Sequence, residues 1–280
     1  MPESSPSNAS RPYRWIFLAL AFVLSWVFWI PAALSGQNVR ASAWTIPHVL
    51  GGFGPSAAGI ILVYRTQDRE GRRAFWARVW GFKRISLPWY LFILFIFPIV
   101  VGLSVVIDLA LGYPLQAFPT LDAIRATPVA LIGMIVIGVV TGPLSEELGW
   151  RGFGLDRFQA RRSPLAAALI TGAFWAVWHL PLFLMRGTNQ YAWQFGSVRF
   201  WLFLLASLPL SIIFTWAANH NHRSILAAVL LHFMYAFTLS LIHPFPTRVY
   251  AYVTALLCLV AVGIVFILGR SAPPEMDEYE

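Results

Sequence analysis

The sequence predicts an all-α fold: a polytopic membrane helical bundle of about eight transmembrane helices around a cytoplasm-facing polar cavity. Composition is the first observation behind this prediction. Of the 280 residues, 58% are hydrophobic and 11% are charged, whereas a soluble domain carries about 25% charged residues. The second observation is that ionisable side chains occur inside apolar segments, where they are costly and mark functional sites. These features disfavour a disordered chain, a soluble enzyme and a nucleic-acid-binding protein.

Eight apolar segments come close to the ~20 residues that a helix needs to cross a bilayer. They are Trp15–Leu34, Trp44–Tyr64, Pro88–Gly112, Pro128 to about Ser145, Pro164–Met185, Phe200–Ala218, Ser224–Ile242 and Val249–Gly269. The first segment lacks the small-residue cleavage pattern of a signal peptide, so we expect it to remain as a helix. The second, fourth and fifth segments contain Gly, Pro or polar residues.

Lys and Arg are distributed unevenly between the two ends of these segments. Fifteen of the twenty lie on the side of the N-terminus and five on the other side. The positive-inside rule therefore predicts cytoplasmic termini, which an even number of spans also requires. We expect one membrane domain over residues 13–270, between disordered tails at 1–12 and 271–280, the second of them acidic. The segment Arg65–Leu87 mixes Arg with aromatic residues and is predicted to lie along the interface as an amphipathic helix.

Three polar features are predicted to have no chemical role. Asp108 is near the outer end of its span, where a solvated or capping role is favoured. The run Asn219–Arg223 links two spans, and its histidines at i and i+2 do not share a helix face. An interfacial loop is therefore favoured over a second metal site. The single cysteine, Cys258, excludes an intramolecular disulfide and is expected to be a small packing residue.

An acidic pair follows the fourth span, at its predicted cytoplasmic end. Glu146, Glu147 and Arg151 occur in the run Gly-Pro-Leu-Ser-Glu-Glu-Leu-Gly-Trp-Arg-Gly. On a continued helix, Glu147 and Arg151 are i and i+4 and face each other. Glu146 points about 100° away from them. The spacing therefore predicts a neutralised pair beside a free carboxylate, which favours chemistry over a mere helix end, because acids at a helix C-terminus oppose the dipole.

Two histidines, His179 and His232, lie inside the fifth and seventh spans. A carboxylate and two imidazoles in a low-dielectric site can activate water for attack on a carbonyl, or can hold zinc. No His-Glu-x-x-His or Gly-x-Ser-x-Gly motif is present. At 1.5 Å per residue, His232 is about 12 Å into its span and His179 about 22 Å. These depths do not match a Glu146 placed at the cytoplasmic edge, unless a span is oblique or a water-filled cavity reaches inward.

Over about residues 45–245 the chain resembles the CAAX-protease and bacteriocin-processing (CPBP, or Abi) family of intramembrane proteases. Three motifs carry the resemblance: Glu146-Glu147-x-x-x-Arg151 is similar to Glu-Glu-x-x-x-Arg, Trp175-x-x-x-His179 to Phe-x-x-x-His, and His232-x-x-x-Ala236 to His-x-x-x-Asn/Asp. Two positions depart from the family pattern. Trp175 replaces a phenylalanine, and Ala236 replaces an asparagine or aspartate.

The resemblance implies a hydrolase that cleaves a membrane-associated protein or peptide, prenylated in the CAAX branch of the family, with no nucleic-acid partner. By position, Glu146 is the base, His179 helps to position water or a metal, and His232 contributes to the oxyanion site. Glu147 and Arg151 form a supporting pair. A divalent metal such as zinc, held by Glu146, His179 and His232, and a metal-free mechanism are equally open. We expect the plasma membrane of a prokaryotic cell as the location.

Ala236 leaves other functions open. Loss of an oxyanion donor costs on the order of 3 kcal/mol, unless Tyr235, Asn219 or Asn221 replaces it. The chain is then a catalytically weakened family member that acts as a membrane immunity or interaction protein. A proton-coupled transporter, in which Glu146 and the histidines relay protons, is a further alternative. Inverted repeats would favour a transporter, and none is visible in the sequence.

Overall fold

In the computed structural model, residues 13–268 are described, and these residues form helices and no strand. The α-helices are α1 (Tyr13–Leu34), α2 (Thr45–Gly52), α3 (Gly54–Thr66), α4 (Arg69–Val79), α5 (Leu87–Ala110), α6 (Pro119–Ala126), α7 (Ala130–Val139), α8 (Ser145–Gly149), α9 (Leu155–Gln159), α10 (Pro164–Trp178), α11 (Asn189–Trp193), α12 (Val198–His220), α13 (Ile225–Leu241) and α14 (Thr247–Leu268). Short 3-10 segments are η2 (Phe82–Arg84) and η5 (Leu180–Leu184), and π-helical segments are η3 (Val140–Leu144) and η4 (Trp150–Gly154).

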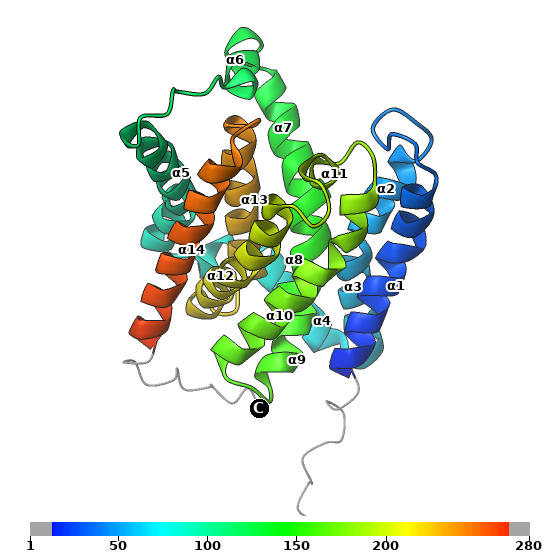
Figure 1. The fold of residues 1–280 in the computed structure, drawn as a ribbon. Helices are drawn as coiled ribbons and strands as arrows, with labels where there is room; N and C mark the ends of the chain where they lie inside the picture. The colour runs from blue at the N-terminus through cyan, green and yellow to red at the C-terminus, as the bar shows by residue number, and fades with distance from the viewer. Residues whose placement is uncertain (1–12, 269–280) are drawn as a thin grey trace, which may run out of the picture.

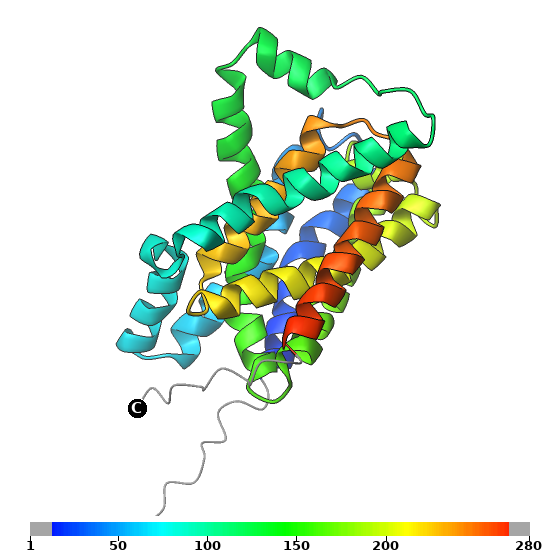
Figure 2. The same ribbon diagram turned by 90° about the vertical axis from the view of Figure 1, so that its left-hand side faces the viewer.

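The polytopic all-α fold is confirmed (Figure 1). Within residues 13–268, six helices are long and apolar enough to cross a membrane, or seven if the bent pair α2–α3 is one span. The remaining apolar helix, α13, has 17 residues, so a total of eight spans stays a prediction. The predicted disordered tails, 1–12 and 271–280, lie outside the described residues. The start of α1 and the end of α14 lie at the same end of the bundle (Figures 1 and 2).

The second predicted span is a broken helix, with a bend of 47° between α2 and α3. Close packing accounts for the glycines at the break, because a Cβ on Gly54 would lie 2.0 Å from the Ser25 hydroxyl of α1. A glycine also allows α3 and α8 to pack closely, since a Cβ on Gly149 would lie 2.1 Å from the carbonyl oxygen of Pro55. Small residues at a helix contact let backbones approach closely in membranes. The helix that carries the acidic pair is thereby held against α3.

The fourth span is longer than predicted, and the expected position of Glu146 at its cytoplasmic end is wrong. The helix runs without a break over 30 residues, Ala130–Gln159. Pro143 lies in the π-helical segment η3, where a proline, which has no N–H, is accommodated by a local change of helical pitch. Glu146 is consequently in the middle of the span, about 20 Å from Gln159 at 1.5 Å per residue. This depth agrees with that of His179.

The turn between α12 and α13 brings His232 to the same level. Asn221 and Ser224 in this turn are 1% and 0% exposed. His222 and Arg223 of the same turn are exposed, so the turn lies at the surface of the bundle and packs only two of its side chains inward. Arg223 binds Asp156 at 2.8 Å. His232 follows Arg223 by nine residues, and Asp156 follows Glu147 by nine, so equal lengths of helix bring His232 to the level of the acidic pair. The run Asn219–Arg223 is a helix end and a turn, as the sequence predicts.

Segment 65–87 forms α4 and η2 at the end of the bundle where α1 starts and α14 ends (Figures 1 and 2). Asp68 caps α4 by accepting a hydrogen bond from the Gly71 N–H, and the helix buries Phe75 and Val79. Arg69, Glu70 and Arg73 are exposed, whereas Arg78 is only 15% exposed and binds Asp156. The predicted amphipathic helix is therefore present.

Asp108 does not have the solvated or capping role that its sequence position predicts. Its side chain is buried, and both of its oxygens accept hydrogen bonds from Arg248, at 2.6 Å from Nε and 3.1 Å from Nη2. The Arg248 guanidinium also lies over the Tyr113 ring, 3.8 Å from its centroid. This ion pair joins α5 to α14 at the end of the bundle opposite to the start of α1. The prediction missed it because the two residues are 140 positions apart in the sequence.

Candidate active site

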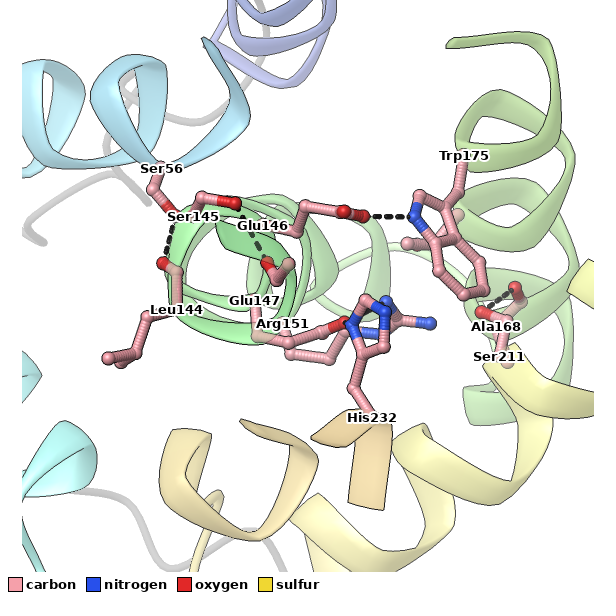
Figure 3. A network of polar contacts seen from close by, with 12 residues as sticks. Ser56, Leu144, Ser145, Glu146, Glu147, Arg151, Ala168, Trp175, Ser211 and His232 are labelled. Carbon is pink, nitrogen blue, oxygen red and sulfur yellow. Dashed lines mark hydrogen bonds and ion pairs between the residues drawn. The ribbon is translucent and has the colours of Figure 1, made fainter. Parts of the chain in front are cut away.

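Three helices bring the candidate residues together (Figure 3). Glu146 and Glu147 occupy consecutive positions of α8, Trp175 lies on α10, and His232 lies on α13. The three helices are far apart in sequence, so the site exists only in the folded bundle. α8 is held there by its contact with α3, and Ser56 of α3 donates a hydrogen bond to the Leu144 carbonyl at 2.8 Å.

Glu147 is the centre of a buried ion cluster. Arg151 Nη1 donates to both of its oxygens, at 3.0 and 2.9 Å, which is the i, i+4 pairing that the spacing predicts. His232 Nδ1 is a second partner, 2.7 Å from Oε1. This contact was not predicted, since no sequence pattern links residues 85 positions apart. Glu147 therefore holds a histidine as well as an arginine.

Arg151 is enclosed by aromatic rings. Its guanidinium lies 5.1 Å from the Trp175 ring centroid and 5.0 Å from that of Phe214. Such cation–π contacts stabilise a desolvated cation by up to about 2 kcal/mol. Nε and Nη2 are buried and have no hydrogen-bond partner among the described residues. The arrangement keeps this charge inside the protein and directs its hydrogen bonds to Glu147.

Glu146 has a different environment from its neighbour. Its Oε2 accepts a hydrogen bond from Trp175 Nε1 at 2.5 Å, while Oε1 has no hydrogen-bond partner among residues 13–268. Figure 3 shows this carboxylate extending toward Trp175 and away from the Glu147–Arg151 pair. One oxygen of Glu146 is therefore available to another ligand.

The two histidines are held through the same ring nitrogen. His179 caps α10, and its Nδ1 is 2.7 Å from the Trp175 carbonyl oxygen. His232 Nδ1 faces the Glu147 carboxylate. A carbonyl and a carboxylate can only accept, so we assign the proton to Nδ1 in both rings. In both histidines Nε2 is then the free ring nitrogen.

Exposure separates the candidate residues into two groups. Glu146, His179 and His232 keep 6%, 7% and 7% of their surface accessible, whereas Glu147 and Arg151 keep 0% and 1%. The first three side chains can reach a molecule outside the protein matrix. The other two are sealed and act only on their neighbours. This difference supports the division into reacting and supporting residues.

Trp175 lies between the three reacting candidates. Its ring centroid is 5.5 Å from that of His179 and 5.3 Å from that of His232, and its N–H binds Glu146. Among the described residues, no group of three or more His, Cys, Asp or Glu side chains is arranged to hold a metal ion. The predicted ligand set Glu146, His179 and His232 thus surrounds an indole ring and does not converge on one point. As arranged, these donors do not fit a metal.

Ala236 stands where the family has an asparagine or aspartate, and Tyr235, Asn219 and Asn221 are the residues considered as replacements. Two of these three form hydrogen bonds with groups outside the candidate site. The Tyr235 hydroxyl is 3.3 Å from that of Tyr250. Asn221 Nδ2 donates to the Ala217 carbonyl at 2.7 Å. The side chain of Asn219, the third, forms no hydrogen bond within the described part of the chain. None of them is bound to the acidic pair or to the histidines.

Comparisons with known proteins point to one family. Residues 128–238 match a family model described as "Type II CAAX prenyl endopeptidase Rce1-like". This range includes every candidate residue above. A protein of Methanococcus maripaludis named "CAAX prenyl protease 2" is 27% identical over 223 residues, which is 78% of this chain and 81% of that protein. These matches confirm the resemblance that the three motifs predict.

Proposed function

We propose that this chain, which belongs to the CAAX-protease and bacteriocin-processing family, hydrolyses a peptide bond of a membrane-associated protein by direct activation of water. Family membership supports an intramembrane endopeptidase as the class of protein. The single observation that carries the mechanism is the state of Glu146: a nearly buried carboxylate with one oxygen bound by Trp175 and the other without a partner. A carboxylate in this state can accept a proton from a water molecule at its free oxygen.

His179 is the second residue that contacts the water in this proposal. Its Nδ1–H is directed to the Trp175 carbonyl, which leaves the Nε2 lone pair to accept a hydrogen bond from water. The packing of its ring against Trp178 and Phe203, with centroids 4.7 and 5.1 Å away, limits rotation. Glu146 and His179 together orient the water and raise its nucleophilicity.

His232 stabilises the oxyanion in this mechanism. Its Nδ1–H donates to Glu147. In a serine-protease triad the histidine donates to the aspartate in the same way and is oriented by it. When His232 is protonated, Nε2–H can donate to the oxygen of the attacked carbonyl. Ala236 leaves His232 as the donor to this oxygen.

The proton balance of the reaction is simple. The water oxygen bonds to the carbonyl carbon while its proton moves to Glu146 Oε1. The tetrahedral intermediate then collapses, the C–N bond breaks, and Glu146 returns the proton to the leaving amine. Collapse gives a carboxylic acid and an amine, the acid passes the second proton of the water to the amine to leave a carboxylate and an ammonium group, and Glu146 is regenerated as a base.

The substrate class is taken from the relatives. The family description and the archaeal protein both name CAAX prenyl proteolysis, so we propose a prenylated protein C-terminus as the substrate here. A lipidated segment would reach an active site inside a bundle of apolar helices from the bilayer. We further propose cytoplasmic termini and the plasma membrane of a prokaryotic cell, for which the archaeal relative is a fitting precedent.

A direct assay tests the function. Purified protein in detergent is incubated with a farnesylated CAAX peptide and with the same peptide without the prenyl group, and the products are identified by mass spectrometry. We expect cleavage of the farnesylated peptide, no cleavage by Glu146→Gln, and activity that survives treatment with a chelator. Activity lost with the chelator and restored by zinc would overturn the metal-free mechanism. A wild type that cleaves neither peptide would favour the weakened, non-catalytic family member that Ala236 suggests.

A further inference from the structure

Trp175 stands where the family motif has a phenylalanine, and the structure gives this difference a chemical consequence. The indole N–H donates to Glu146 Oε2 at 2.5 Å. A phenylalanine ring at the same position can make the aromatic contacts but has no donor. The hydrogen bond to the proposed base is therefore a property of this chain's own residue.

We propose that Trp175 is a positioning residue that selects which oxygen of Glu146 accepts the proton from water. This inference rests on the proposed function and refines it. With Oε2 engaged by the indole, Oε1 is the oxygen left for water. The same bond fixes the rotation of the carboxylate. A carboxylate with two equivalent free oxygens would not have this fixed orientation.

The indole is well suited to this task because it is itself fixed. Trp175 is 4% exposed, and Arg151 covers one side of its ring at 5.1 Å from the centroid. Ring contacts with His179, His232 and Phe214, with centroids 5.5, 5.3 and 6.1 Å away, enclose it further. A donor with so little freedom can hold its acceptor in one geometry.

The bond also affects the charge state of the base. A hydrogen bond donated to a carboxylate favours its ionised form, and only the ionised form accepts a proton from water. The other charged or titratable groups that act on Glu146 are His232 from α13 and Glu147 and Arg151 from its own helix. Replacement of Trp175 by phenylalanine leaves these three side chains in the chain but also changes the ring that Arg151 and His232 contact. A changed pH response is therefore assigned to the lost N–H when 3-benzothienylalanine at position 175, which keeps the bicyclic ring without the donor, gives the same response.

The test is the pH profile of kcat/KM for peptide cleavage by the wild type and Trp175→Phe. Removal of the donor makes Glu146 harder to ionise, so the acid limb of the profile should move to higher pH. A hydrogen bond to a charged group predicts a movement of about 1 to 2 pH units. Activity should recover on the alkaline side, where Glu146 is ionised in both proteins.

Trp29→Phe is the matched control. Trp29 is 1% exposed, and its indole N–H donates to the His48 carbonyl at 2.8 Å, away from the acidic pair. The control loses the same ring atoms and the same kind of donor. It should lower thermal stability and leave the acid limb in place.

An unchanged acid limb in Trp175→Phe, with activity lowered equally at every pH, would show a purely structural role and overturn the proposal. This outcome is distinct from failure of the proposed function, in which the wild type cleaves nothing. If Trp175→Phe does not fold, 3-benzothienylalanine at position 175 keeps the bicyclic ring without the N–H donor. A double-mutant cycle of thermal stability with Glu146→Leu, which removes the acceptor oxygens, provides a readout without catalysis, and absence of coupling between the two positions would contradict the proposal.

Discussion

Two carboxylates nine positions apart on one helical span each lie between two cationic partners, yet their surroundings differ. Glu147 binds Arg151 and His232 inside the bundle, and its side chain is 0% exposed. Asp156 binds Arg78 and Arg223, at 2.6 and 2.8 Å, and its side chain is 24% exposed. One partner of Glu147 is a histidine, whereas both partners of Asp156 are arginines.

This difference indicates that the Asp156 cluster stabilises the fold, whereas the Glu147 cluster is part of the candidate active site. The Asp156 cluster joins α4, the start of α9 and the turn before α13, because Arg78 also donates to the Arg223 carbonyl at 2.7 Å. It fixes the end of the bundle where α1 starts and α14 ends. The Glu147 cluster contains a histidine and lies beside Glu146, whose Oε1 has no hydrogen-bond partner among the described residues. We therefore expect changes near Glu147 to affect chemistry, and changes near Asp156 to affect stability only.

The largest effect is expected for Glu146→Gln. The amide keeps the size and an acceptor oxygen but cannot take a proton, so hydrolysis should fall by about 10²-fold or more. Cleavage per folded molecule, with folding judged by size-exclusion chromatography and thermal melting, is the measurement. Asp156→Asn is the control, because it removes one negative charge from the same helical span. Equal activity of Glu146→Gln and wild type would remove Glu146 from the mechanism.

Glu147→Gln should have the second largest effect, on stability and on activity together. Loss of the charge leaves Arg151 uncompensated in a buried site, which costs about 3 kcal/mol or more. His232 also loses the carboxylate that orients it. Loss of that partner costs up to about 10⁴-fold in serine proteases, so cleavage per folded molecule should fall at least about tenfold. A variant that is unstable but fully active per folded molecule would show that Glu147 only neutralises Arg151.

These two expectations show what the sequence could and could not provide. The Glu147–Arg151 pair is local, so its i, i+4 spacing was enough to predict it. The contact of Glu147 with His232 is tertiary and had no signature in the sequence. The depth of Glu146 was misjudged because charges and Pro143 indicate a helix end, while the chain continues through π-helical turns.

The apolar segments were predicted well for a physical reason. Helices are the only way to satisfy the backbone of a single segment in lipid, so hydropathy alone locates them. The break between α2 and α3 and the role of Trp175 were harder to foresee. Both depend on what packs against a residue, Ser25 in one case and Glu146 in the other, and a motif shows only which residue type stands at a position.

Asp156→Asn should have a moderate effect that is confined to stability. Its two arginine partners are partly exposed, so the loss should be about 1 to 2 kcal/mol, with unchanged cleavage per folded molecule. High salt provides a second measurement, because exposed ion pairs are screened and buried ones are much less so. We expect 1 M NaCl to reduce the stability difference between wild type and Asp156→Asn and to leave that of Glu147→Gln nearly unchanged. A salt response of equal size in both variants would contradict the contrast between the clusters.

The smallest effect on stability is expected for substitutions of Arg223. Two of them, to alanine and to glycine, distinguish loss of the ion pair from relief of backbone strain. Arg223 has a positive φ of 57°, a conformation that glycine adopts without penalty and other residues do not. Its side chain is 48% exposed, so the ion pair with Asp156 contributes less than about 1 kcal/mol. Arg223→Ala loses this pair and keeps the strain, and its melting temperature should be slightly lower than that of the wild type. Arg223→Gly loses the same pair and relieves the strain, so it should melt at or above the temperature of Arg223→Ala. The reverse order of the two variants would mean that the turn before α13 is not strained at this position.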